Sequence, residues 1–177
     1  LKAQLLQAQV LHADESPITI LARKGEKTRG YIWAYATGAH ETVDAVVYQI
    51  KPGRSGQHAK DFLQFERPRR RIDQQVDDPP SSKRWSGHLV VDDYGGYKAL
   101  FVPDASASKE AGLDGSIIEV GCWAHVRRKF FELHVAAKSS LAEVALAHIG
   151  ALYGVERAIH DEGLDVKLAT VRRQQES

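Results

Sequence analysis

The sequence contains no methionine and only one cysteine, Cys122, among its 177 residues. A single cysteine cannot form a disulfide within the chain, which is typical of proteins from a reducing compartment. No apolar run approaches the roughly 18 residues that span a bilayer, and the first residues lack the apolar core of a signal peptide. We therefore expect a cytoplasmic protein without a membrane partner. The absence of methionine also leads us to expect a fragment of a longer protein.

The sequence also lacks a strong net charge. The formal net charge is +1, so overall charge gives no argument for binding to nucleic acid. Basic residues do cluster locally, in the range 67–71 and at Arg127, Arg128 and Lys129. Taken alone, each cluster is more typical of a solvated face than of a phosphate-binding surface.

The apolar content that is present is that of an ordinary globular domain. A length of 177 residues predicts one domain with a hydrophobic core. We place this domain at residues 10–160, after a lead-in at 1–9 and before a polar tail with a truncated end at 161–177. Residues 66–87 combine an arginine run with two adjacent prolines and few apolar side chains. This composition predicts a surface insertion.

Five short apolar segments are predicted to form strands. In the first, period-two alternation places His12 and Asp14 on one face and Leu11 and Ala13 on the other. The short connections between the first three strands favour an antiparallel meander. The sequence predicts an α/β fold, a mixed five-stranded sheet flanked by helices. The strands are expected at 10–14, with extended chain continuing to 21, and at 31–37, 42–50, 89–92 and 116–122, and the helices at 55–63, 123–137 and 140–160.

Acids lie at the exits of the first and fourth predicted strands. If these strands are neighbours in the sheet, Asp14 and Asp92 lie together, and paired carboxylates suit the magnesium or manganese ions of two-metal phosphoryl transfer. The alternative for Asp92 is structural, because two aspartates followed by Tyr94 and two glycines are well suited to begin a turn. From these residues alone, the turn is the more frequent explanation.

Cys122 and His125 have the spacing of half a zinc site. A structural zinc site needs four ligands, and the sequence has no second cysteine. We therefore interpret Cys122 and Trp123 as core residues and His125 as the start of a helix.

Five segments resemble, in the same order, the central domain of insertion-sequence-66-type transposases. One short motif such as Asp-Glu-Ser-Pro carries little information, but five in register over roughly residues 10–160 are specific. The matching segments are residues 12–17, 30–35, 52–58, 91–97 and 119–131.

The resemblance implies an RNase H-like fold with a DDE catalytic set. Its first acid falls on Asp14 and its second on Asp92, with Asp93 ranked behind Asp92. The third acid of the family is a glutamate in an asparagine-rich helix, and no Asn-Asn-x-x-Glu motif occurs in this sequence. We therefore assign Asp14 and Asp92 as catalytic and metal-binding residues for Mg²⁺ or Mn²⁺, and leave the third acid unassigned.

The resemblance further implies a DNA partner. His125, Arg127, Arg128 and Lys129 become candidates for contacts with DNA phosphates. The implied function is metal-dependent DNA cleavage and strand transfer during transposition of an insertion sequence. We expect a homo-oligomer on the transposon ends and target DNA, with accessory transposition proteins, in the nucleoid. Two alternatives stay open: an RNase H-like nuclease or resolvase that cuts without strand transfer, and an inactive truncated remnant that only binds DNA.

Overall fold

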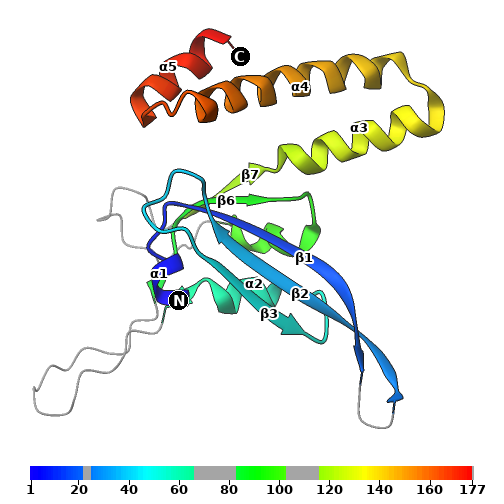
Figure 1. The fold of residues 1–177 in the computed structure, drawn as a ribbon. Coiled ribbons are helices and arrows are strands. Elements are labelled where there is room, and N and C mark those ends of the chain that lie inside the picture. The colour runs from blue at the N-terminus through cyan, green and yellow to red at the C-terminus, as the bar shows by residue number, and fades with distance from the viewer. Residues whose placement is uncertain (22–24, 66–82, 103–115, 177) are drawn as a thin grey trace, which may run out of the picture. The chain divides into compact units, whose positions relative to one another are not determined.

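The computed structural model describes residues 1–21, 25–65, 83–102 and 116–176. The chain falls into two compact units, Leu1–Gly121 and Cys122–Ser177, and each is described by itself (Figure 1). Of the predicted insertion at 66–87, residues 66–82 lie outside the described residues.

The first unit contains a five-stranded sheet. Its strands are β1 (Val10–Leu21), β2 (Lys27–Thr37), β3 (Val46–Lys51), β6 (Gly87–Val91) and β7 (Ile117–Gly121). The order across the sheet is β3-β2-β1-β6-β7. β2 pairs antiparallel with β1 and with β3, whereas β6 pairs parallel with β1 and with β7. The sheet is therefore mixed, and the antiparallel meander and the α/β architecture are as predicted, consistent with an RNase H-like fold.

Short helices flank this sheet. They are α1 (Lys2–Leu5), α2 (Gly56–Phe62) and the 3₁₀ helix η2 (Gly95–Leu100). Ser55 begins α2 as expected, because its side-chain oxygen accepts a hydrogen bond from the Gln57 amide. A separate ladder pairs β4 (Gln64–Phe65) with β5 (Lys83–Arg84).

The hydrophobic core lies on one face of the sheet. Alternation along the strands buries Leu11 and Ala13 of β1 and Trp33 and Tyr35 of β2. The Tyr35 ring stacks on Phe62 of α2 with ring centroids 3.7 Å apart. Other buried members of this core come from α1, α2, η2, β6 and β7: Leu5, Ala59, Phe62, Leu63, Leu89, Val91, Tyr97, Leu100 and Ile117.

Trp85 connects the end of the predicted insertion to the core. Its side chain is buried, and its Nε1 donates a hydrogen bond to the Ala8 carbonyl at 2.9 Å. Burial of a tryptophan together with a satisfied indole N–H is a stabilising arrangement. The described residues at the end of the 66–87 segment are therefore part of the packed unit.

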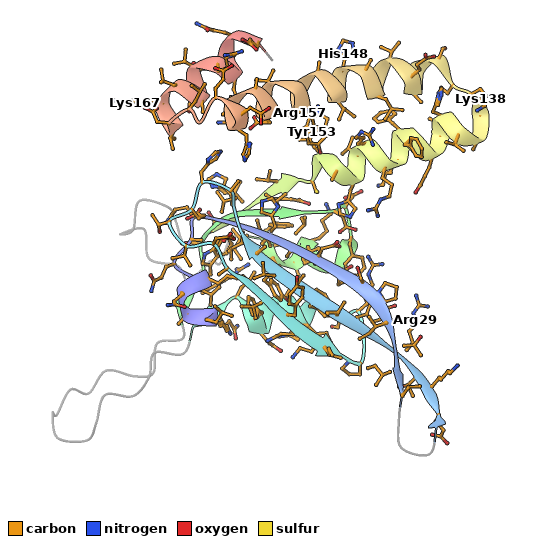
Figure 2. The ribbon with its side chains drawn as sticks, viewed as in Figure 1. Arg29, Lys138, His148, Tyr153, Arg157 and Lys167 are labelled. Carbon is orange, nitrogen blue, oxygen red and sulfur yellow. The ribbon has the colours of Figure 1, made fainter. Side chains whose placement is uncertain are left out.

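The second unit consists of three helices, α3 (Trp123–Ala137), α4 (Ser140–Asp161) and α5 (Val166–Glu176). Lys138 ends α3 in the left-handed region with φ of 50°. Ser139 then caps α4 by accepting a hydrogen bond from the Ala142 amide at 3.3 Å. Figure 2 shows Tyr153 on the side of α4 that faces α3, and His148 on the opposite side.

α5 replaces the expected polar tail. The segment has few apolar residues, so its sequence shows little helical periodicity. Ala169 is nevertheless only 1% exposed and packs with Val155 and Ile159 of α4. The Asp165 carboxylate accepts a hydrogen bond from the Leu168 amide at 2.9 Å, which stabilises the start of α5. The helix is also tied to α4 by an ion pair between Arg173 and Glu156 at 2.6 Å. No helix among the described residues is both long and apolar enough to cross a membrane.

Candidate active site

β1 and β6 are neighbouring parallel strands, with Asp14 inside β1 and Asp92 directly after β6. The prediction that Asp14 lies at the exit of the first strand is wrong, because β1 continues to Leu21 and Asp14 pairs with Ala34 of β2. Leu11 pairs with Leu89, and His12 pairs with Val90. The same register, continued by two residues, sets Asp14 of β1 beside Asp92, the residue that follows β6. Because adjacent strands lie about 4.8 Å apart, this continued register predicts that two acids distant in the sequence are neighbours.

Asp14 lies on the face of the sheet opposite the packed core, and Asp92 lies beyond the end of β6. Along β1 and β6 the buried positions are Leu11, Ala13, Leu89 and Val91, and the positions between them turn the other way. Asp14 has this other parity and is exposed, and the Asp92 side chain is 22% exposed. Asp92 follows the last residue of β6, and its Oδ2 lies 3.9 Å from the Arg54 nitrogen that also binds the core-side Glu15, so strand parity does not define its face.

Asp92 also begins the turn into η2. Its Oδ1 accepts a hydrogen bond from the Tyr94 amide at 3.1 Å, which is an Asx turn. Its Oδ2 faces Nη2 of Arg54 at 3.9 Å. The turn and the ligand interpretations of Asp92 are compatible, because they use different oxygens of one carboxylate.

Glu15 is the buried acid of this unit. The residue is 6% exposed, and its carboxylate lies on the core side of β1. Oε1 accepts a hydrogen bond from Nε of Arg54 at 2.6 Å, and Oε2 accepts one from the Tyr97 hydroxyl at 2.5 Å. Both oxygens of this carboxylate are thus satisfied, as a buried charge requires.

Arg54 is held from a second direction by Tyr94. Its guanidinium carbon lies 3.7 Å from the centroid of the Tyr94 ring, and the Tyr94 hydroxyl donates to the Arg54 carbonyl oxygen. Burial opposes the charge of Arg54, but the hydrogen bond to Glu15 and the charge of Glu15 raise the pKa of Arg54. Burial, the hydrogen bond to Glu15 and the charge of Glu15 all raise the pKa of Tyr97, so its hydroxyl keeps its proton and donates.

Asp93 points into a different cluster. Its Oδ1 lies 2.9 Å from Nζ of Lys98, which also lies 2.8 Å from Oε1 of Glu119 on β7. The Asp93 side chain is 75% exposed. Hydrogen bonds to Glu119 and to Asp93 raise the pKa of Lys98. The geometry therefore separates Asp93 from Asp92, whose Oδ2 faces Arg54.

The predicted DNA-contacting residues all lie on α3 in the second unit. Arg127, Arg128 and Lys129 are exposed, and His125 is half-buried in the first turn of the helix. Cys122, the residue before α3, is only half-buried, and Trp123 is 54% exposed, so the prediction that both are core residues is wrong. Within the described residues, no group of three or more His, Cys, Asp or Glu side chains is placed to hold a metal ion.

Comparison with known proteins identifies the family. A family model described as the IS66 family of transposases matches residues 1–177. The chain belongs to the IS66 transposase family. Membership of this family suggests a transposase-related function. No solved structure matches the chain significantly.

Two curated relatives of this IS66-family chain come from Sinorhizobium fredii. One, named Uncharacterized protein y4qI, is 27% identical over 97% of the chain, and the match covers 28% of that protein. The other, named Uncharacterized protein y4hP, is 26% identical over the whole chain, and the match covers 30% of that protein. The chain thus spans less than a third of the length of these relatives.

Sequence reasoning missed Glu15 and its partners in this IS66-family chain. Period-two alternation from Leu11 and Ala13 already puts Glu15 on the apolar face, and a charged residue at such a position indicates a buried pair. No comparable signal marks Arg54 or Tyr97, because only the tertiary structure brings the segment before α2 and η2 to the end of β1.

Proposed function

We propose that this chain is part of the catalytic core of a DDE transposase that cleaves DNA and transfers a strand during transposition of an insertion sequence. The observation that supports this most is the parallel register of β1 and β6, which, continued by two residues, makes Asp14 and Asp92 neighbours. Two carboxylates in this arrangement are the start of a metal-dependent phosphoryl-transfer site.

The donor set fits magnesium or manganese. Both ions prefer oxygen ligands, and magnesium in particular is often held by one or two carboxylates together with water and substrate phosphate. Asp14 is exposed, and Oδ2 of Asp92 faces the partly exposed side of Arg54, so both carboxylates are open to solvent. When bound, the cation supplies Lewis-acid chemistry that activates the attacking water or 3′-hydroxyl and stabilises charge on the leaving oxygen.

The residues of the chain then have separate roles. Asp14 and Asp92 hold the cation. His125, Arg127, Arg128 and Lys129 contact DNA phosphates, which fixes the position of the duplex but not the choice of sequence. The partners of this proposal are the transposon ends and target DNA, further copies of the protein, and accessory transposition proteins.

The test is cleavage and joining of DNA that carries the ends of the insertion sequence, with Mg²⁺ or Mn²⁺. Asp14→Asn and Asp92→Asn should each abolish both reactions while leaving the circular dichroism spectrum unchanged. Asp93→Asn is the matched control, because Asp93 is adjacent but pairs with Lys98. Cleavage that persists in Asp14→Asn or Asp92→Asn would overturn the assignment of these acids.

The same assay separates the two alternatives. Metal-dependent cleavage without joining supports an RNase H-like nuclease or resolvase. Binding to DNA with neither reaction supports a remnant that only binds DNA.

A further inference from the structure

Arg54 stands between two acids and binds only one of them closely. It donates from Nε to Glu15 Oε1 at 2.6 Å, and its Nη2 also lies 2.6 Å from that oxygen. The same Nη2 lies 3.9 Å from Oδ2 of Asp92, which is longer than a hydrogen bond. We propose that Glu15 is a positioning residue that holds Arg54 back from Asp92, so that Asp92 stays available to a divalent cation. The proposal rests on the metal-binding role of Asp92 given above.

The position of Arg54 is fixed from several sides. Glu15 takes the Nε edge of the guanidinium, and the Tyr94 ring covers one of its faces at 3.7 Å. The Tyr94 hydroxyl also donates to the main-chain carbonyl of Arg54. Glu15 is itself fixed by the Tyr97 hydroxyl at 2.5 Å. A buried carboxylate with both oxygens occupied is a rigid anchor for the arginine.

Release of Arg54 would bring it onto Asp92. The Arg54 side chain is 41% exposed, so it has room to move, and a gap of 3.9 Å needs only a small shift to become a hydrogen bond. Arginine binds carboxylates through paired N–H donors, and a carboxylate held in this way offers fewer oxygens to a metal ion. By binding Arg54, Glu15 therefore keeps this arginine from competing with the cation for Asp92.

Glu15 is not a candidate for the third catalytic acid. Its side chain is 0% exposed, and it lies on the opposite side of β1 from Asp14. Both of its oxygens already accept hydrogen bonds. Its effect on the site is exerted through Arg54.

The experiment measures Mn²⁺ affinity by calorimetry in the wild type, Glu15→Gln and the double variant Glu15→Gln, Arg54→Gln. Glu15→Gln removes the anchoring charge but keeps the shape, and the freed guanidinium should weaken Mn²⁺ binding about tenfold, the change expected from one competing charged hydrogen bond. The double variant removes the competitor and should bind Mn²⁺ at least as tightly as the wild type. A merely structural role of Glu15 predicts no recovery in the double variant.

Glu41→Gln is the matched control. Glu41 also pairs closely in this unit, accepting a hydrogen bond from the Val10 amide at 2.6 Å, but it has no contact with Arg54. Its substitution should lower stability without changing Mn²⁺ affinity. Unchanged Mn²⁺ affinity in Glu15→Gln, or a double variant as weak as Glu15→Gln, overturns the proposal.

A readout without metal separates this proposal from the proposed function. The ¹⁵N resonance of Arg54 Nε should hardly change on Asp92→Asn in the wild type, because the group donates to Glu15. In the Glu15→Gln background the same Asp92→Asn change should shift it clearly. If the wild type binds no Mn²⁺, the metal site fails, while this comparison still decides whether Glu15 keeps Arg54 from Asp92. Equal sensitivity to Asp92 in both backgrounds overturns the positioning role.

Discussion

Asp14 and Glu15 are consecutive residues of β1, and their carboxylates lie on opposite faces of the sheet. Asp14 is exposed beside the start of the turn at Asp92, whereas Glu15 is 6% exposed and bound to Arg54 and Tyr97. Period-two geometry alone gives adjacent residues these different environments. Asp14 is therefore exposed to solvent, whereas Glu15 stabilises the packing of Arg54 and Tyr97 against β1.

This difference predicts opposite results for two adjacent alanine substitutions. Glu15→Ala leaves Arg54 and Tyr97 without their partner and should lower the free energy of unfolding by about 2–3 kcal/mol. The loss is smaller than the about 3–5 kcal/mol of a fully buried pair, because Arg54 is 41% exposed and water can replace part of the interaction. Asp14→Ala should change stability by less than about 0.5 kcal/mol. Urea denaturation of both variants measures the difference, and equal losses would contradict the geometry.

The raised pKa of Tyr97 predicts a loss of stability in alkali. The usual tyrosine pKa is 10.0, and burial with the Glu15 hydrogen bond raises the pKa of Tyr97 well above it. Above about pH 10 the unfolded chain releases this proton while the folded chain keeps it, so the free energy of unfolding falls as pH rises. Tyr97 contributes at most about 1.4 kcal/mol per pH unit to this slope.

Tyr97→Phe should make this alkaline slope shallower. It should also cost about 1 kcal/mol at neutral pH, because Glu15 loses one donor. Tyr48→Phe is the control, because Tyr48 is 64% exposed on β3, and it should leave the slope unchanged. Urea denaturation at several values between about pH 8 and pH 11 makes the comparison. A slope that is the same in the wild type and Tyr97→Phe would count against the buried hydroxyl.

Gly56 is predicted to be essential for the contact between α2 and η2. A Cβ atom at Gly56 would overlap the main-chain carbonyl of Gly96, and backbone atoms cannot move aside as a flexible side chain can. Gly56→Ala should therefore lower the free energy of unfolding by about 2 kcal/mol or more. Gly95→Ala is the matched control, since its Cβ would meet nothing within 4 Å. Thermal denaturation of the two variants gives the test, and a tolerated Gly56→Ala would show that the helices do not pack this closely.

The basic residues of α3 give a prediction about DNA. Replacing Arg127, Arg128 and Lys129 together with glutamine should weaken DNA binding at low salt. The slope of log affinity plotted against log salt concentration should decrease in magnitude by about one for each DNA phosphate that the protein no longer neutralises. The effect should be similar for DNA of any sequence, because phosphate contacts carry no base information.

A control with equal charge loss is available in the same unit. Lys138, Arg157 and Lys167 are exposed and lie at the end of α3, on α4 and on α5 (Figure 2). Replacing these three with glutamine should leave the salt dependence close to that of the wild type. Fluorescence anisotropy with a labelled duplex measures both triple variants. Equal weakening by the two triples would mean that general charge, and not the α3 cluster, binds the DNA.

Much of the sheet was predictable from residue patterns. Alternation predicted that Leu11 and Ala13 share one face of β1 and that Asp14 lies on the other, because strand side chains must alternate. The structure then shows that the face with Leu11 and Ala13 is the buried one. The short connections predicted the meander of β1 to β3. α5 was not predicted, since a helix with one small buried residue, Ala169, and several ion pairs leaves almost no apolar signal.

The sequence by itself determined the strands, their faces and the family, because these depend on local periodicity and on ordered motifs. Only the tertiary structure decided which strands are neighbours, and that parallel pairing sets Asp14 beside Asp92. It also decided that Glu15 binds Arg54 and Tyr97, since those residues reach β1 from the segment before α2 and from η2. Contacts between segments far apart in the chain depend on how the whole unit packs, and no local pattern encodes them.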